Sequence, residues 1–391
     1  MRRNASSIPK FVLSRRSVVA GGILSLLAAE PAKAAPRTTG VINVCDPPYN
    51  AGSNRSSRAN TRAIARAIAD APLCSKIIFP EPLSVAPQDG GYIKLTKPLD
   101  LEGVGWHSQL IPDPDISSTA PVISILGIPR GVIFHWGIRN LTIGNNANGN
   151  NVNPLQALRE GGHGIHIETN QRFAGTENCE IEQVYTQEGR YGQESYGIYL
   201  HHSNPGNAGA IYNFTISRCM IQGGIRMIRV ADSVRVLNSL IFGKNDVDID
   251  VKPGAGNLTL RGNNVSSEGG FRLRAGPAAL IEGNVFAQQL VSTNPNNALV
   301  DIDGDIETMI GVTMIGNRFQ TEANLGNPWL VRCNNVESPM IWGNSFKLPS
   351  AYTPIEFTEL CVKANVGPNI WDIGGATPWV NKNSKSPVNV F

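Results

Sequence analysis

The sequence NLTLRGNNV (257–265) is one of six copies of a nine-residue pattern. The other copies are NFTISRCMI (213–221), SVRVLNSLI (233–241), AALIEGNVF (278–286), GVTMIGNRF (311–319) and SPMIWGNSF (338–346). Each copy alternates apolar and polar residues, then places Asn, Ser or Cys two residues before a final apolar residue. The copies recur every 20 to 33 residues. A period in the low twenties, lengthened by occasional loops, is typical of one turn of a parallel β-helix.

A second alternating strand lies between consecutive copies. These strands are GIHIE (164–168), GIYLH (197–201), MIRVA (227–231), DIDVK (248–252), FRLR (271–274), LVDID (299–303) and LVRCN (330–334). We expect them to lie side by side and parallel, with residues such as Ile165, Ile167, Ile228 and Val230 stacked in apolar ladders inside the coil. The predicted fold class is all-β: a single-stranded right-handed parallel β-helix with two strands in each of about seven turns.

The region before these repeats resembles the N-terminal part of the pectate-lyase-like superfamily. The likeness rests on TRAIARAIADA (61–71), IIFPEP (77–82) and LDLEGVGWHSQLIPD (99–113). It implies a capping helix whose apolar stripe covers the open end of the coil. We therefore expect a cap and first turns over 35–113, the β-helix over 114–350 and a C-terminal tail or cap over 351–391.

The N-terminus has the features of an export signal. A twin-arginine pair, Arg15-Arg16, precedes a short apolar stretch that is too short to span a bilayer. Ala32-Lys33-Ala34 matches a small-x-small cleavage pattern, so residues 1–34 are the predicted signal peptide and Ala35 the first mature residue. The predicted location is the periplasm or the cell exterior.

The composition argues against several functional classes. The chain has 34 Lys and Arg against 31 Asp and Glu, and six of those basic residues but only one acid fall within residues 1–34. The rest is close to neutral, which gives no electrostatic case for nucleic-acid binding, and no other stretch is apolar enough to span a membrane. Of the six cysteines, only Cys45 and Cys74 are a plausible disulfide pair; Cys179, Cys219 and Cys333 should face inward.

The outward positions of the second strand should form two columns of side chains about 4.8 Å apart. They include His166, Tyr199, Arg229, Asp250, Arg272, Asp301 and Arg332 in one column, and Glu168, His201, Lys252, Arg274 and Asp303 in the other. Inserts at 144–163, 185–196, 287–298 and 320–328 should wall a groove beside them. The outward positions of the first strand are mostly uncharged, with Thr215, Thr259 and Thr313 beside a single charge at Arg235. A charged groove with aromatic side chains suits an acidic polysaccharide, with both columns supplying substrate-binding residues.

Residues 246–286 resemble the central turns of polysaccharide lyase family six, the chondroitinase B and alginate lyase family, which carries "VKS..N" and "G…RhG…N.F" segments. The resemblance implies that Lys252 is the catalytic base and Arg274 the catalytic acid of a β-elimination. Ca²⁺ held by Asp248 and Asp250 would neutralise the uronate carboxylate. Pro253 and Ala275 depart from the family's Ser and His.

Other functions fit the same face. Tyr196-Gly197-Ile198-Tyr199-Leu200-His201 resembles the YGFDPH pattern of mannuronan C5-epimerases, with Tyr199 in place of Asp, and makes Tyr199 and His201 catalytic candidates. Asp301, Asp303 or Glu168 could serve a glycoside hydrolase. The alternating charges could also be an ion-pair ladder on a carbohydrate-binding scaffold without catalysis.

The export hypothesis has a direct test. Replacing Arg15 and Arg16 by Lys together should leave the protein in the cytoplasm, because the twin-arginine route reads both guanidinium groups. Fractionation and immunoblotting of the double variant measure this. Normal export of the double variant would rule out the twin-arginine route.

Overall fold

The computed structural model describes much of the chain after residue 39. The described residues are 40–88, 91–113, 115–116, 118, 120–126, 133–144, 163–169, 175–177, 179–186, 196–202, 211–229, 233–242, 247–252, 257–267, 271–274, 278–288, 298–304, 308–321, 329–348 and 353–391. The predicted signal peptide lies outside them, as does most of each of the four predicted inserts. Residues Thr39–Phe391 form one compact unit.

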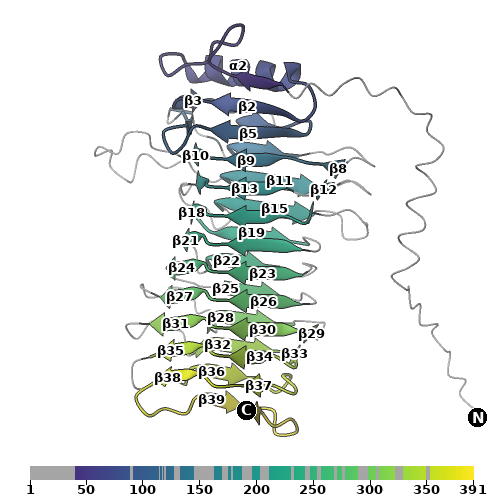
Figure 1. The fold of residues 1–391 in the computed structure, drawn as a ribbon, viewed down its shortest axis with the longest axis vertical. Helices are drawn as coiled ribbons and strands as arrows, with labels where there is room; N and C mark the ends of the chain where they lie inside the picture. Colours follow the sequence, from purple (N-terminus) through teal and green to yellow (C-terminus); the bar gives the residue numbers. More distant parts are fainter. Residues whose placement is uncertain are drawn as a thin grey trace, which may run out of the picture. The chain divides into compact units, whose positions relative to one another are not determined.

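Three long parallel sheets surround one apolar core in this unit (Figure 1). Sheet 1 contains β1 (Val41–Asn43), β2 (Ser75–Phe79), β5 (Leu99–Gly103), β9 (Gly137–Arg139), β13 (Glu180–Glu182), β17 (Thr215–Ser217), β20 (Val234–Leu237), β23 (Leu258–Arg261), β26 (Ala279–Glu282), β30 (Val312–Ile315), β34 (Met340–Trp342), β37 (Asn365–Val366) and β40 (Asn389–Val390). Sheet 2 contains β3 (Leu83–Val85), β6 (Gln109–Pro112), β10 (Thr142–Ile143), β14 (Tyr185–Thr186), β18 (Met220–Gln222), β21 (Leu240–Phe242), β24 (Asn264–Ser267), β27 (Val285–Gln288), β31 (Arg318–Thr321), β35 (Ser345–Lys347) and β38 (Ile370–Asp372).

Sheet 3 contains β4 (Ile93–Lys94), β7 (Ile123–Ile125), β11 (Ile165–Thr169), β15 (Ile198–His202), β19 (Ile225–Ile228), β22 (Ile249–Val251), β25 (Phe271–Arg274), β28 (Ala298–Asp303), β32 (Trp329–Asn334), β36 (Ile355–Phe357) and β39 (Trp379–Asn381). Two small parallel sheets join β8 (Ile133–Phe134), β12 (Gly175–Glu177) and β16 (Ile211–Tyr212), and β29 (Met309–Ile310) with β33 (Val336–Glu337). The predicted right-handed parallel β-helix is confirmed.

Each complete turn has three strands rather than the two that we expected. Each nine-residue copy bends in its middle and supplies one strand to sheet 1 and one to sheet 2, as β23 and β24 do. The bend falls at a residue in the left-handed conformation, such as Gly262 with a φ of 66° or Gly283 with a φ of 62°. The period-two alternation continues across the bend, so the sequence pattern did not reveal it.

An asparagine ladder fixes this bend in successive turns. The Asn263 backbone N–H donates to Asn284 Oδ1 at 2.9 Å, and the Asn284 N–H donates to Asn317 Oδ1 at 3.0 Å. Asn344 continues the series toward the C-terminus, and Ser239 continues it toward the N-terminus. The amide nitrogens also donate to backbone carbonyls of the preceding turn, as Asn284 does to Leu260 at 3.0 Å. These side chains are almost fully buried, so each amide satisfies backbone groups that water does not reach.

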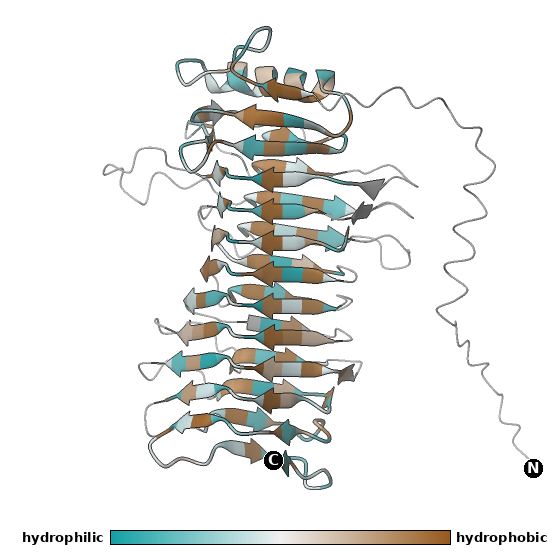
Figure 2. Cartoon of the chain, in the orientation of Figure 1, coloured by the Kyte–Doolittle hydropathy of each residue, from teal (hydrophilic) through white to brown (hydrophobic). Residues whose placement is uncertain are grey.

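Apolar side chains fill the coil in rows, which Figure 2 shows as aligned brown bands. Ile165, Ile167, Val251 and Ile302 are fully buried, as predicted. Cys179, Cys219 and Cys333 are also buried, so their inward placement is confirmed. Stacked aromatic rings run through the C-terminal turns, from Phe286 over Phe319 and Phe346 to Trp371. The structure forms no Cys45–Cys74 disulfide.

A helix covers the N-terminal end of the coil. Helix α2 (Ser57–Asp70) buries Ile64, Ala67 and Ile68 against the first turns, which confirms the capping helix. Lys97 Nζ donates to the Ala69 carbonyl at 2.7 Å near the end of the helix. At the other end, residues 353–391, expected to be a tail or cap, add β36 to β40 to the same three sheets.

The ladder makes a stability prediction. Asn284→Ala removes the acceptor of the Asn263 N–H and the donor to the Leu260 carbonyl, both in the interior. We expect the free energy of unfolding to fall by roughly 2–4 kcal/mol in urea denaturation, because buried polar groups lose their partners. Asn389→Ala is the control, since the Asn389 amide bonds to Asn365 on the exposed surface. Equal losses for both variants would contradict the structural role of the ladder.

Candidate functional site

The outward face of sheet 3 carries the candidate site residues in two columns. The first column, in strand order, is His166, Tyr199, Arg226, Asp250, Arg272, Asp301, Arg332 and Glu356. The second runs from Glu168 through His201 to Ile228, and further along from Arg274 through Asp303 to Asn334. Lys252 follows the Val251–Met227 pair, and its N–H donates to the Met227 carbonyl, so it stands between Ile228 and Arg274. The side chain of Arg274 lies outside the described part of the chain.

Arg226, not Arg229, occupies the first column. The strand predicted over 227–231 is β19 over 225–228, so Ile225 and Met227 face inward and Ile228 faces outward. Arg229 lies past the end of the strand, is exposed and has a φ of 51°. The expected placement of Arg229 was therefore wrong, as was that of Ile228.

A sequence signal for the correct register was present. Gly224-Ile225 begins β19 just as Gly197-Ile198 begins β15. A β-carbon added at Gly224 would lie 2.5 Å from the Asp248 carbonyl oxygen of the next turn, so the backbones approach too closely for a side chain. Aligning these Gly-Ile pairs would have placed Arg226 beside Tyr199.

Five rings cluster on β11, β15 and the residues that precede them. The Tyr199 ring centroid lies 4.4 Å from that of His163, 4.8 Å from that of His166 and 5.6 Å from that of His201. The Tyr196 ring lies 6.1 Å from Tyr199. His163 and Tyr196 were not among the predicted site residues. Such a cluster offers flat surfaces and hydrogen-bonding groups, a combination that is common in ligand sites.

Two of the three histidines in this cluster, His166 and His201, favour the neutral form. Burial lowers the pKa of His166 to about 4, against the opposing effect of the Glu168 carboxylate. Burial also lowers the pKa of His201, where Glu168 again opposes the shift and the positive charge of Arg229 adds to it. A neutral imidazole has a free nitrogen lone pair, so it can accept a proton.

Arg226 connects the ring cluster to the charged part of the columns. Its Nη1 donates to Tyr196 Oη at 3.1 Å, and its guanidinium lies 5.2 Å from the centre of the Tyr196 ring. Its Nε lies 3.7 Å from Asp250 Oδ2, and the same oxygen lies 3.3 Å from Lys252 Nζ. The buried Asp250 carboxylate therefore holds two cations at the edge of the ring cluster.

These contacts bear on the predicted calcium ligands, Asp248 and Asp250, which are both buried. Asp250 already faces Arg226 and Lys252. Among the described residues, no group of three or more His, Cys, Asp or Glu side chains could hold a metal ion. Calcium binding stays a prediction.

Arg332 lies at the centre of a second charged cluster farther along the columns. Its Nη1 lies 3.1 Å from Asp301 Oδ1 and 3.8 Å from Asp303 Oδ2, and its Nε lies 3.2 Å from Glu356 Oε2. Lys382 Nζ pairs with the other oxygen of Glu356. Neither Glu356 nor Lys382 was predicted, because both fall in the segment expected to be a tail.

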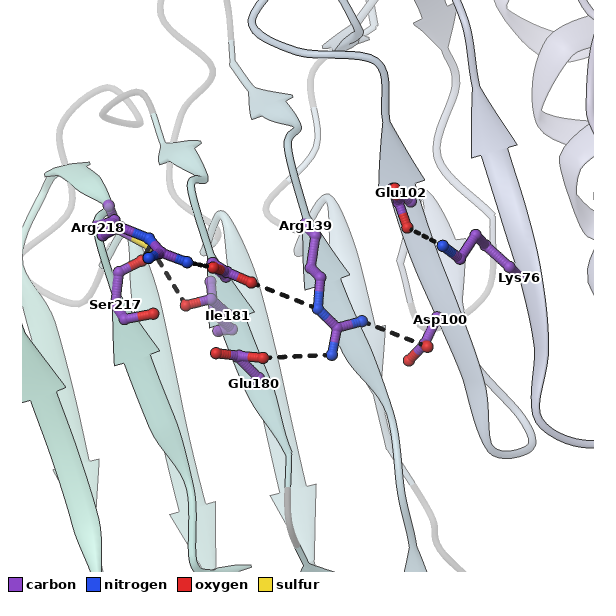
Figure 3. A network of polar contacts seen from close by, with 10 residues as sticks. Lys76, Asp100, Glu102, Arg139, Glu180, Ile181, Ser217 and Arg218 are labelled. Atoms are coloured by element: carbon purple, nitrogen blue, oxygen red, sulfur yellow. Dashed lines mark hydrogen bonds and ion pairs between the residues drawn. The ribbon is translucent and has the colours of Figure 1, made fainter.

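Sheet 1 carries a charged network of its own in the N-terminal turns (Figure 3). Arg139 pairs with Asp100 and Glu180 at 3.3 Å each and with Glu182 at 3.7 Å, and Arg218 also pairs with Glu182. Exposed ion pairs contribute only about 0–1 kcal/mol each, so charge alone does not mark a site. The stacked rings distinguish sheet 3 from sheet 1.

Comparison with known proteins identifies the fold. No protein-family model and no curated protein matches this sequence. The N-terminal fragment of bacteriophage phi29 gene product 12 is similar, with a TM-score of 0.58, 14% identity and coverage of 96% of this chain and 68% of that one. The catalytic unit of a GH87 α-1,3-glucanase from Streptomyces thermodiastaticus is also similar, with a TM-score of 0.52 and 16% identity. This match covers 93% of this chain and 68% of that one.

A third similar structure is PfbA, a surface adhesin of Streptococcus pneumoniae, with a TM-score of 0.51, 11% identity and coverage of 84% of this chain and 90% of that one. The chain thus has the right-handed parallel β-helix fold of these proteins. Within the described residues, no helix is long and apolar enough to cross a membrane.

The partly buried His166 makes a pH prediction. The unfolded chain takes up this proton near pH 6.5 and the folded chain only near pH 4, so the stability that His166 contributes is present above pH 6.5 and is lost as the pH falls toward 4. An NMR titration should show the His166 imidazole protonating well below pH 6.5. The variant His166→Gln should lose less stability than wild type between pH 6.5 and 4. Protonation of His166 near pH 6.5 would show that the ring is not buried as described.

Proposed function

We propose that this protein acts on an acidic polysaccharide and cleaves it by β-elimination at a uronate residue. The proposal rests on one arrangement in the second column, where the half-buried Ile228 side chain lies between His201 and Lys252. We call these three residues the Ile228 saddle. Neighbouring rows are about 4.8 Å apart, so the β-carbons of His201 and Lys252 are roughly 10 Å apart. This gap has room for one pyranose ring above an apolar floor.

His201 is the proposed base. Burial and the nearby Arg229 charge favour its neutral form, and its imidazole is only partly covered. A base with a lowered pKa is unprotonated at neutral pH and can remove the C5 proton of a sugar placed over Ile228. Glu168, on the neighbouring strand in the same column, opposes the shift and would stabilise the imidazolium that forms.

Lys252 and Arg226 are the proposed partners of the uronate carboxylate. Neutralising that carboxylate makes the C5 proton more acidic, because the carbanion develops charge on the same group. Both cations share the Asp250 carboxylate, which holds them in place without substrate. The pairing with Asp250 favours a charge-neutralising role for Lys252 over the role of base implied by family six.

The elimination then needs a proton donor for the leaving oxygen. As His201 takes the C5 proton, the C4–O bond breaks, a double bond forms between C4 and C5, and the released oxygen takes a proton. The Tyr199 phenol, stacked beside His201, is the proposed donor. If C5 were instead reprotonated from its other face, with the C4–O bond intact, the same residues would make a C5-epimerase.

Similarity of fold supports a polysaccharide as the partner, since the α-1,3-glucanase has the same architecture. The acidic character of the substrate is proposed from Arg226, Lys252 and Arg272 on the face itself. Export through the twin-arginine route, proposed from the sequence, would bring the protein to polymers outside the cytoplasm.

Hydrolysis is a second candidate, favoured by the carboxylates around Arg332. Asp301 and Asp303 are buried on one strand, both within 4 Å of Arg332 Nη1. A pair of carboxylates on one face is what a glycoside hydrolase needs as acid and base. Both carboxylates are already paired with the Arg332 guanidinium, however, so they belong to an ionic cluster rather than to an open acid-base pair.

The proposed function predicts the behaviour of four variants. On a panel of alginate, pectate, glycosaminoglycan and bacterial exopolysaccharides, wild type should release unsaturated sugars that absorb in the ultraviolet. His201→Gln and Lys252→Met should each lower kcat by roughly 10²–10⁴, the usual contribution of a proton-transfer group. His107→Gln and Lys347→Met, at exposed positions away from sheet 3, are the matched controls and should keep wild-type rates.

Three outcomes would overturn parts of this proposal. Retained turnover in both His201→Gln and Lys252→Met would show that the saddle is not the active site. Loss in Lys252→Met and Arg274→Ala, with His201→Gln active, would support the base and acid implied by family six instead. Reversible, salt-sensitive binding of a panel polymer without cleavage would make the face a recognition surface.

A further inference from the structure

A cavity opens at the C-terminal end of the sheet 3 face. Its volume is about 490 Å³, and Trp329, Arg332, Asn334, Glu356, Thr358, Glu359, Leu360 and Lys382 line it. The row of Arg332 lies three strands from that of Asp250, or roughly 14 Å along the coil. The cavity is therefore separate from the Ile228 saddle but on the same face.

Both cations that line the cavity already have carboxylate partners. Arg332 faces Asp301 at 3.1 Å and Glu356 at 3.2 Å, and Lys382 holds the second oxygen of Glu356. Asp301 and Glu356 are almost fully buried. Two cations here face three carboxylates, those of Asp301, Asp303 and Glu356, whereas the two cations beside Ile228 share the Asp250 carboxylate alone. A carboxylated ligand would add to this excess of negative charge and be repelled.

The other lining groups suit hydroxyls. Thr358 Oγ1 donates to Asn334 Oδ1 at 2.6 Å, so the hydroxyl oxygen faces its neighbours as an acceptor for further donors. Asn334 Nδ2 donates to Asp303 Oδ1 at 2.8 Å and retains a second N–H. The exposed Glu359 carboxylate accepts hydrogen bonds, and Trp329 and Leu360 supply apolar walls.

The geometry points to a binding site for a neutral, hydroxyl-rich sugar unit in this cavity. Sugar hydroxyls donate to the carboxylates and accept from the second N–H of the Asn334 amide without disturbing the ion pairs. The indole of Trp329 packs against the apolar face of the sugar ring. This inference rests on the proposed function only in that the ligand is a saccharide. Combined with the uronate site at Ile228, it describes a polymer that contains both acidic and neutral sugars.

Short saccharides test the cavity separately from the saddle. The probes are cellotriose, laminaritriose and mannotriose, with trigalacturonate as the charged counterpart, titrated by calorimetry and by the NMR signal of the Trp329 indole. We expect at least one neutral trisaccharide to bind and to shift that signal. Trp329→Ala and Thr358→Val should each weaken its binding, the first by roughly tenfold or more, equivalent to about 1.4 kcal/mol. His201→Gln should leave it unchanged.

Thr313→Val is the matched control for Thr358→Val. It removes a half-buried hydroxyl from the outward face of sheet 1 and should leave binding unchanged. No binding of any neutral probe, or binding that survives both cavity substitutions, would overturn the inference. Trigalacturonate binding that depends on Trp329 while the neutral probes do not bind would overturn the assigned charge class. Neutral binding through Trp329 without cleavage of any panel polymer would remove the lyase proposal and keep the cavity site.

Discussion

The hydrogen bond that a backbone N–H donates to the asparagine side chain of the next turn is the contact on which the rest of the structure depends. In the series from Asn263 to Asn344, each side-chain oxygen accepts from the backbone N–H of the residue one turn earlier, which locks the bend between sheets 1 and 2 at the same height in successive turns. A slip of one residue would turn apolar side chains outward and polar ones inward. The ladder thus sets the register of the strands that follow it, including those of sheet 3.

The register of the turns decides which side chains become neighbours in the candidate site. Tyr199, Arg226 and Asp250 are far apart in sequence, yet they occupy consecutive rows because each lies at the same position of its turn. Burial also changes the acid-base properties of this face, since packing against the sheet removes water from His166 and lowers its pKa. At the other end of the face, the same packing buries Asp301 and Glu356 around Arg332. One sheet therefore presents a neutral, aromatic region and a tightly paired ionic region.

The sequence predicted the coil and seven of the eleven sheet 3 strands, six of them in the correct register, because burial inside a repeating turn imposes a regular alternation of apolar and polar residues. The capping helix followed from the resemblance at 61–71. The sequence missed the bend within each repeat, since alternation continues through a left-handed residue. It misplaced β19, where both Met227 and Ile228 are apolar and hydrophobicity does not choose a face; only Gly224 marks the correct start. It also missed His163, Tyr196 and Glu356, because they join the site through contacts across turns rather than through any pattern within one turn.

The one-row-per-turn construction has a consequence for how such a protein changes over evolutionary time. A sheet 3 strand pairs only with its immediate neighbours, as β25 does with β22 and β28. Duplication or deletion of a complete turn would therefore lengthen or shorten the face by about 4.8 Å while leaving distant rows intact. The spacing between the Ile228 saddle and the C-terminal cavity is a whole number of turns, so it can change only in steps of one turn. A lineage can therefore change the distance between the two sites by duplicating a turn, without altering the residues at either end.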